Sequence, residues 1–187
     1  MLNFYIIIGI LIWLYIISLL KRANLSGYYF WIGSIGLFLL LSFYVHTYYT
    51  WLMSHIITEI IGIMSKLVHS IKIYDMLNEI TIQRNNFVVQ ILITYECSGI
   101  LEFLAFESLL LFFPIYSKKE KIRLSIVGFS WIVVANILRL LIIIISILIW
   151  GPDTIFWTHA IVGRMIFYIL IIILFYNVFT KEQILRK

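Results

Sequence analysis

Long, unbroken runs of apolar residues are the main pattern of this chain. About 20 consecutive apolar residues in a helix cross the hydrocarbon core of a bilayer, and polar residues divide the runs here into segments of about that length. The pattern therefore predicts an all-α integral membrane protein with about five transmembrane helices. The predicted spans are 2–20, 27–45, 100–116, 124–150 and 156–179.

The stretch between the second and third spans follows two different patterns. Over 51–72 apolar residues recur at helical spacing, while Ser54, Thr58 and further polar residues occupy the opposite face. This pattern predicts an amphipathic helix that lies in the membrane interface; a sixth span is the alternative. Over 78–95 the apolar residues alternate with period two, which predicts a short β-hairpin with its turn at 84–86.

Composition supports the membrane assignment, and the distribution of charge gives its orientation. Of the 187 residues, 63% are hydrophobic and 12% are charged, about half the charged fraction of a soluble domain. The basic residues gather in the loops and tail of one side, which the positive-inside rule assigns to the cytoplasmic face of a multi-pass plasma-membrane protein. They are Lys21, Arg22, Lys118, Lys119, Lys121, Arg123, Lys181, Arg186 and Lys187. The segment 46–97 then faces outward and the C-terminus faces the cytoplasm.

In this orientation the chain forms a single membrane domain over 1–187. Residues 1–46 are expected to form two N-terminal spans, 47–97 the outer helix and hairpin, and 98–180 a three-span core. Cys97 is the only cysteine, which excludes an internal disulfide and a cysteine-rich metal site. We expect no metal, cofactor or nucleic acid as a partner; the lipid bilayer is the surroundings.

Ionisable and amide side chains interrupt the last three spans. A charged side chain at the centre of a bilayer costs about 2.5–3.5 kcal/mol on insertion scales, so each one indicates a structural or functional role. Depth along the helices would allow Glu107 to pair with Arg139, and such a pair could serve only to hold helices together. Arg139 keeps its proton and has five donors, which suits a carboxylate or a developing oxyanion. The residues concerned are Glu102, Glu107, Asn136, Arg139, His159 and Arg164.

Cys97 stands at the start of the third span, within the sequence Glu-Cys-Ser-Gly. Backbone N–H groups and the helix dipole stabilise a thiolate at such a position, which favours a nucleophile, although the neighbouring Glu96 opposes it. The alternative is a free cysteine packed as a small hydrophobic residue. Asn136 fits a hydrogen bond between helices, and His159, taken alone, fits an interfacial anchor.

Three separated motifs follow one another in the second half of the chain. They are Glu-Cys-Ser-Gly at 96–99, Ala-Asn-Ile-Leu-Arg at 135–139 with Gly151-Pro152 after it, and His159 followed by Gly163 and Phe167. In order and spacing they resemble the exosortase/archaeosortase family of membrane-embedded cysteine transpeptidases. The resemblance covers about residues 75–180 and is to a compact, Gram-positive-like form.

The resemblance implies a cysteine protease or transpeptidase at the outer face of the plasma membrane. By position it makes Cys97 the nucleophile, with Arg139 and His159 as catalytic partners, and leaves Arg164 as a second candidate for the role of His159. Substrates would be secreted proteins with a C-terminal recognition motif, a transmembrane helix and a basic tail. The enzyme would cleave this sorting signal through a thioester and transfer the protein to an acceptor nucleophile. The further candidate site residues are Ser98, Asn136, Glu102 and Glu107.

The depth of Arg139 conflicts with this implied chemistry. In a straight span that ends at Trp150, Arg139 would lie roughly 16 Å below the outer surface, too deep to reach Cys97. Either the helix projects beyond the bilayer, or it tilts, or a polar cavity descends from the outer face, and we favour the cavity. It would be lined by Glu102, Glu107, Asn136 and Arg164.

Two other classes of function remain open at this point. A non-catalytic membrane scaffold or assembly factor would use buried charges only to hold helices together, and Cys97→Ala would leave its function intact. A small transporter would use Glu107 and Arg139 as a relay, and its flux would survive loss of the thiol.

Overall fold

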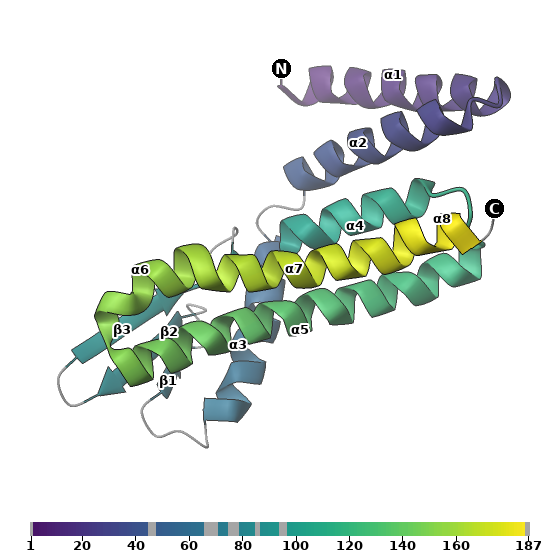
Figure 1. The fold of residues 1–187 in the computed structure, drawn as a ribbon. Helices are drawn as coiled ribbons and strands as arrows, with labels where there is room; N and C mark the ends of the chain where they lie inside the picture. Colours follow the sequence, from purple (N-terminus) through teal and green to yellow (C-terminus); the bar gives the residue numbers. More distant parts are fainter. Residues whose placement is uncertain are drawn as a thin grey trace.

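The computed structural model describes residues 2–44, 48–65, 71–74, 79–84, 87–93 and 97–185, and most of them are helical. The longer helices lie roughly parallel and alternate in direction, with α1 packed on α2, α2 on α4, α4 on α5 and α5 on α7 (Figure 1). Their bounds are α1 Leu2–Arg22, α2 Ser26–Tyr44, α4 Ile100–Phe112, α5 Lys118–Trp150 and α7 Gly163–Phe175.

Three helical stretches are long and apolar enough to cross a membrane: Ser26–Tyr44, Lys118–Trp150 and Pro152–Ile184. The prediction of a largely helical membrane protein is confirmed. The count of five spans stays a prediction, to which α1 is suited by its 21 mostly apolar residues.

The third predicted span, 100–116, is wrong in length. Helix α4 has 13 residues and covers roughly 20 Å, less than the hydrocarbon thickness of about 30 Å. It ends at Phe112 because Phe113 precedes Pro114, and a residue before proline is driven out of the helical region. Phe113 accordingly has extended backbone angles, with φ −67° and ψ 122°.

Helix α5 is longer than predicted at its inner end. It begins at Lys118, because Ser117 and Glu120 form a reciprocal capping box in which each side chain accepts from the other's backbone N–H. It ends at Gly151, whose φ of 91° lets the chain turn back toward α6 (Ile155–Trp157). Its 33 residues cover roughly 50 Å, which exceeds the hydrocarbon core.

A three-stranded antiparallel sheet covers the C-terminal end of α5, the end that the sequence predicts to face outward (Figure 1). The predicted hairpin is confirmed as β2 (Glu79–Arg84) and β3 (Phe87–Leu92), paired with Ile80 opposite Ile91; residues 85 and 86 of its turn lie outside the described part. A third strand, β1 (Ile71–Tyr74), pairs with β2. The fold prediction, which included the hairpin, therefore lacked only β1.

The sheet is held to the bundle by aliphatic side chains. Along β2 and β3 alternate residues point inward, and these join the outer half of α5 and part of α3 (Tyr48–Ser65) in one apolar cluster. Alternation with period two is what allows a short hairpin to bury one face. The buried members of this cluster are Ile57, Ile61, Ile80, Ile82, Val89, Ile91, Ile93, Cys97, Leu140, Ile143, Ile144 and Ile147.

Helix α3 runs across the direction of the long helices, which agrees with the prediction of a helix along the membrane surface (Figure 1). Its predicted end was wrong, because 71 and 72 belong to β1, while 66–70 lie outside the described residues. Its polar face was wrong in part: Ser54 and Thr58 are buried, whereas Glu59 is exposed. Burial is tolerated because Thr58 Oγ1 donates to the carbonyl of Ser54, and Ser54 Oγ donates to that of Ile93.

The last helical stretch is not a uniform α-helix. After the turn at Pro152–Thr154, a π-helical turn spans Thr158–Val162, α7 follows, and a second π-helical turn, Tyr176–Thr180, leads into α8 (Lys181–Leu185). Isolated π-helical turns occur mostly at functional sites, because the wider turn changes the direction of the side chains it contains.

Candidate active site

The loop that enters α4 places Cys97 beneath the sheet. Cys97 is 6% exposed and belongs to the apolar cluster of the strands and the outer half of α5. Gly99 allows the loop to turn, with φ +76°, and to lie against α5, since a Cβ there would be 3.3 Å from Ile132 Cγ2. Ser98 Oγ accepts from the backbone N–H of Ile100 at the start of α4. The backbone thus presents the sulfur to the neighbouring helices.

Two polar side chains converge on the sulfur of Cys97. The Nε2 atom of His159 lies 3.4 Å from Sγ, and the Nη2 atom of Arg139 donates to Sγ at 3.5 Å. Arg139 is 3% exposed, and His159 is partly exposed. The thiol therefore faces one group that exchanges a proton near neutral pH and one that keeps a positive charge.

His159 reaches the sulfur from the first π-helical turn. The preceding residue, Thr158, is buried, and its hydroxyl donates to the carbonyl of Thr154 at 2.8 Å, which ties the turn to its own start. Arg139 and Arg164 both lie close enough to His159 to act on it electrostatically. The wide turn thus directs an imidazole toward α5, beside a fixed cation.

Arg139 is held between α5 and α7 by small and aromatic neighbours. A Cβ at Gly163 would lie 3.2 Å from Arg139 Cγ, so the glycine lets α7 approach the arginine stem. The guanidinium carbon lies 5.7 Å from the ring centre of Phe167, within range of a cation–π interaction. Its Nε has no hydrogen-bond partner among the described residues. One donor of the fork is therefore free for a substrate atom.

Asn136 ties the cysteine loop to α5. Its Nδ2 donates to the carbonyl of Cys97 at 2.8 Å, and the side chain is fully buried. Its Oδ1 has no partner among the described residues. This contact agrees with the interpretation of Asn136 as a structural hydrogen-bond group. Its acceptor is the backbone carbonyl of Cys97.

The other candidate residues are spread more widely. Glu102 is partly buried in the first turn of α4 and lies within electrostatic range of Arg139. Glu107 bonds to Ser125 and lines a hollow between α4 and α5 with Lys118 and Lys121. Arg164 is exposed on α7 and does not contact the sulfur.

The predicted Glu107–Arg139 ion pair is wrong. Among the described residues Glu107 makes no ion pair, and it lines the hollow beside Lys118 and Lys121. The pairing followed from measuring depths along the helices from Trp150. Arg139 instead lies beside Cys97, because the sheet and the loop of Cys97 pack against the C-terminal half of α5. The polar cavity expected at the site stays a prediction.

Among the described residues, no group of three or more His, Cys, Asp and Glu side chains is arranged to hold a metal ion. The site consists of a thiol from the loop before α4, a guanidinium and an amide from α5, and an imidazole from the first π-helical turn. A family model described as transmembrane exosortase matches residues 1–176. The chain belongs to the transmembrane exosortase family. No curated protein and no solved structure matches it.

At the level of the family, the exosortase assignment means a membrane-embedded sorting transpeptidase with secreted proteins as substrates. The resemblance inferred from the three motifs is thereby confirmed, and the match extends it to the N-terminal helices α1 and α2.

Sequence reasoning gave no role to Phe167 and Gly163, although both belong to the third motif. A usable signal was present: His159, Gly163 and Phe167 recur every four residues and so share one helical face. That face meets Arg139 through the close approach at Gly163 and the ring of Phe167. The pattern showed a face but not which helix it would pack against.

Proposed function

We propose that this exosortase-family chain is an active cysteine transpeptidase that cleaves C-terminal sorting signals of secreted proteins at the outer face of the plasma membrane. The observation that supports the proposal is the convergence of His159 Nε2 and Arg139 Nη2 on the sulfur of the only cysteine. A scaffold has no need of this convergence. A Glu107–Arg139 relay finds no support, because Glu107 bonds to Ser125 instead.

In the acylation step, His159 takes the proton of the Cys97 thiol, and the thiolate attacks the scissile carbonyl carbon. A C–S bond forms while the carbonyl π electrons move to oxygen. As the oxyanion collapses, the C–N bond breaks, and the imidazolium gives its proton to the leaving amine. The product is a thioester on Cys97 and a free sorting signal. Splitting one slow displacement into two steps lowers each barrier.

In the deacylation step, the neutral imidazole of His159 removes a proton from the incoming acceptor, an amine or water. The acceptor bonds to the thioester carbon, the C–S bond breaks, and the sulfur regains a proton from His159. The same residue thus acts as base and then acid in each half-reaction, a contribution of about 10²–10⁴-fold for such groups.

Arg139 stabilises negative charge in both half-reactions. Its Nη2 already donates to the sulfur. Its Nε, which has no partner among the described residues, offers a second donor to the oxyanion on the carbon that the sulfur attacks. Donors held in place before reaction are the most effective, particularly in a site with little water. Asn136 acts through the backbone, holding the carbonyl of Cys97 so that the sulfur keeps its position.

The orientation of the enzyme follows from charge. The nine basic loop and tail residues favour a cytoplasmic C-terminus, and the long helices alternate in direction as five spans would require (Figure 1). Cys97, α3 and the sheet then lie at the outer face, where a secreted substrate arrives. Arg139, in the C-terminal half of α5, and His159, in the π-helical turn that follows, lie at the same end of the bundle.

The proposal is tested by following a secreted host protein that carries a C-terminal transmembrane helix and basic tail. Cells with Cys97→Ala should accumulate the unprocessed form, whereas Ser130→Ala, an exposed residue bonded only to its own helix, should process normally. Normal processing in the Cys97→Ala cells would contradict an enzymatic role and favour the scaffold.

A further inference from the structure

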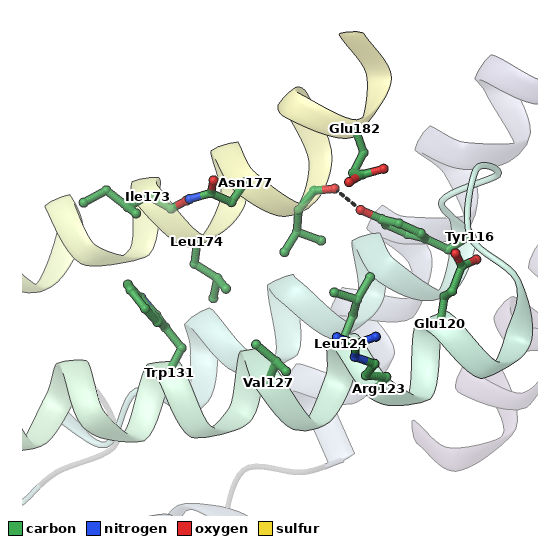
Figure 2. Close-up of a pocket in the computed structure, with 11 residues that line it drawn as sticks. Tyr116, Glu120, Arg123, Leu124, Val127, Trp131, Ile173, Leu174, Asn177 and Glu182 are labelled. Atoms are coloured by element: carbon green, nitrogen blue, oxygen red, sulfur yellow. Dashed lines mark hydrogen bonds between the residues drawn. The ribbon is translucent and has the colours of Figure 1, made fainter. Parts of the chain in front are cut away.

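The seam between α5 and α7 opens into a hollow at the end opposite Cys97. The hollow has a volume of about 510 Å³ and a mainly apolar floor of Leu124, Val127 and Leu174. Figure 2 shows Trp131 near one end and the carboxylates of Glu120 and Glu182 near the other. A hollow of this kind on the flank of a bundle accepts a chain that is apolar in the middle and polar at its end.

The charge at the polar end of the hollow is unusual for this face of the protein. The loops and tail that carry the nine basic residues contain only two acidic ones, Glu120 and Glu182, and both line the hollow. Arg123 lines it as well, so the local balance is one negative charge in an otherwise positive region. The two carboxylates therefore make this end of the hollow more favourable for a cation than the surrounding loops and tail.

The hollow lies on the same seam as the active site. Two contacts between α5 and α7 follow the seam away from Cys97: Arg139 against Gly163, and Trp131 Nε1 donating to the carbonyl of Leu170. Beyond them Tyr116, in the connection before α5, donates to the carbonyl of Val178 in the second π-helical turn. From Arg139 to Glu120, α5 rises roughly 28 Å, about the thickness of the hydrocarbon core. A single transmembrane helix laid along the seam would have one end at Cys97 and the other at Glu120.

We propose that the hollow binds the cytoplasmic end of the substrate's transmembrane helix, and that Glu120 and Glu182 attract the basic residues beyond it. This inference rests on the proposed function. Helices that end in the cytoplasm carry Lys and Arg there by the positive-inside rule, which complements the two carboxylates. The phosphate of an anionic lipid would be repelled by the same groups, so the charge favours a cationic helix end over a lipid.

The test uses the full chain in lipid nanodiscs, with Cys97→Ala to remove the thiol. The probe is a synthetic helix of about 20 Leu and Ala residues with a Lys-Arg-Lys tail and one cysteine near that tail. Val127→Cys reports from inside the hollow. Ile126→Cys, the preceding residue, lines the separate hollow beside Lys118 and Lys121 and serves as the matched control. Cross-linking by a short bis-maleimide is compared at the two positions.

We expect cross-linking at Val127→Cys to exceed that at Ile126→Cys and to fall about fivefold when the tail is Glu-Asp-Glu, the size expected for an exposed charge pair. Adding Glu182→Lys should restore cross-linking to the acidic tail and weaken it to the basic one. Glu182 is chosen because Glu120 also caps α5. Glu182→Gln should weaken cross-linking to the basic tail less than Glu182→Lys does. It checks that the reversed charge has not simply unfolded the end of the chain.

Equal cross-linking at the two positions, or no dependence on tail charge, would overturn the docking proposal; the second result would show that apolar contact alone places the helix in the hollow. Binding needs no thiol, so this outcome is independent of catalysis. A chain that docks the basic helix but never processes substrate would contradict only the proposed function. A chain that processes substrate without cross-linking at Val127→Cys would contradict only the docking site.

Discussion

The two ends of the α5–α7 seam are built from the same pair of helices but differ in how closely they approach. At the outer end Gly163 lets α7 meet the stem of Arg139, and the helices close around Cys97 with the sheet above them. At the other end Trp131 donates to the carbonyl of Leu170 on α7, Tyr116 donates to that of Val178 in the following π-helical turn, and a hollow remains beside them.

The comparison shows how side-chain size changes the closeness of two helices along one interface. A glycine removes the volume that would separate two helices, which allows three polar groups to contact within a closed site. Large aromatic side chains bridge the helices with single hydrogen bonds and leave space for a ligand. The closed end suits bond-making, which requires precise geometry, and the open end suits recognition of a variable, greasy segment.

The strongest way to break this comparison is to remove the imidazole from the closed end. His159→Ala should lower the rate of processing by about 10²–10⁴-fold, because neither the thiol nor the leaving amine would have a proton partner. A purified assay with an internally quenched peptide of the sorting motif measures this. His55→Ala, a histidine of α3 near Glu59, is the matched control and should retain activity. A His159→Ala enzyme with wild-type activity would remove His159 from the mechanism.

A smaller volume change at the closed end should have the next largest effect. In Gly163→Ala the new Cβ would lie 2.8 Å from the carbonyl oxygen of Thr158 and 3.2 Å from Arg139 Cγ, so the turn and the guanidinium must shift. We expect a loss of about 10²-fold in kcat, since displacements near 1 Å have that effect. Gly27→Ala, where a Cβ meets nothing within 4 Å, should be neutral. Equal activities of the two variants would show that close approach is unimportant.

The support of the nucleophile backbone should contribute less. Asn136→Ala removes the donor to the carbonyl of Cys97 and leaves that buried carbonyl short of a partner, a loss of about 1–3 kcal/mol in stability. Thermal unfolding in detergent measures the change. We expect kcat to fall by about tenfold with a nearly constant KM, because the sulfur is displaced and the substrate contacts are not. An unchanged melting temperature would contradict the importance of this hydrogen bond.

The open end should be the most tolerant of change. Trp131→Phe removes one donor to the carbonyl of Leu170, which lies within helix α7. We therefore expect the free energy of unfolding to fall by at most about 1 kcal/mol. Cleavage of a short soluble peptide should be unaffected, since that substrate has no helix for the seam. A large loss of peptide cleavage would show that the two ends are coupled rather than separate.

The fold was predictable wherever a repeating pattern stood alone. Alternation with period two identified β2 and β3, and long apolar runs identified a helical membrane protein. The prediction failed for α4, where Pro114 ends the helix early, and for part of the polar face of α3, since Ser54 and Thr58 bond to backbone carbonyls inside the protein. In a membrane, a polar stripe marks the protein side as readily as the water side.

For the site, the sequence identified the chemical types but not their depths. Cys97, Arg139 and His159 were recognisable from three motifs, and the structure brings them into contact. Their distances could not be predicted, because they depend on how the sheet and the loop of Cys97 pack against the C-terminal half of α5. The same uncertainty produced the wrong pairing of Glu107 with Arg139. Hydropathy locates residues along a helix, but only packing fixes which parts lie outside the lipid.

The most direct test of the central claim is mass spectrometry of the enzyme trapped during turnover. Incubation of the full chain with substrate, followed by acid quenching and proteolysis, should yield a peptide containing Cys97 joined to the new C-terminus of the secreted protein. Treatment with neutral hydroxylamine should release it, as expected of a thioester, and Cys97→Ala should give none. Continued processing of substrate by the wild type, with no adduct on Cys97 in the sample kept free of hydroxylamine, would contradict the account.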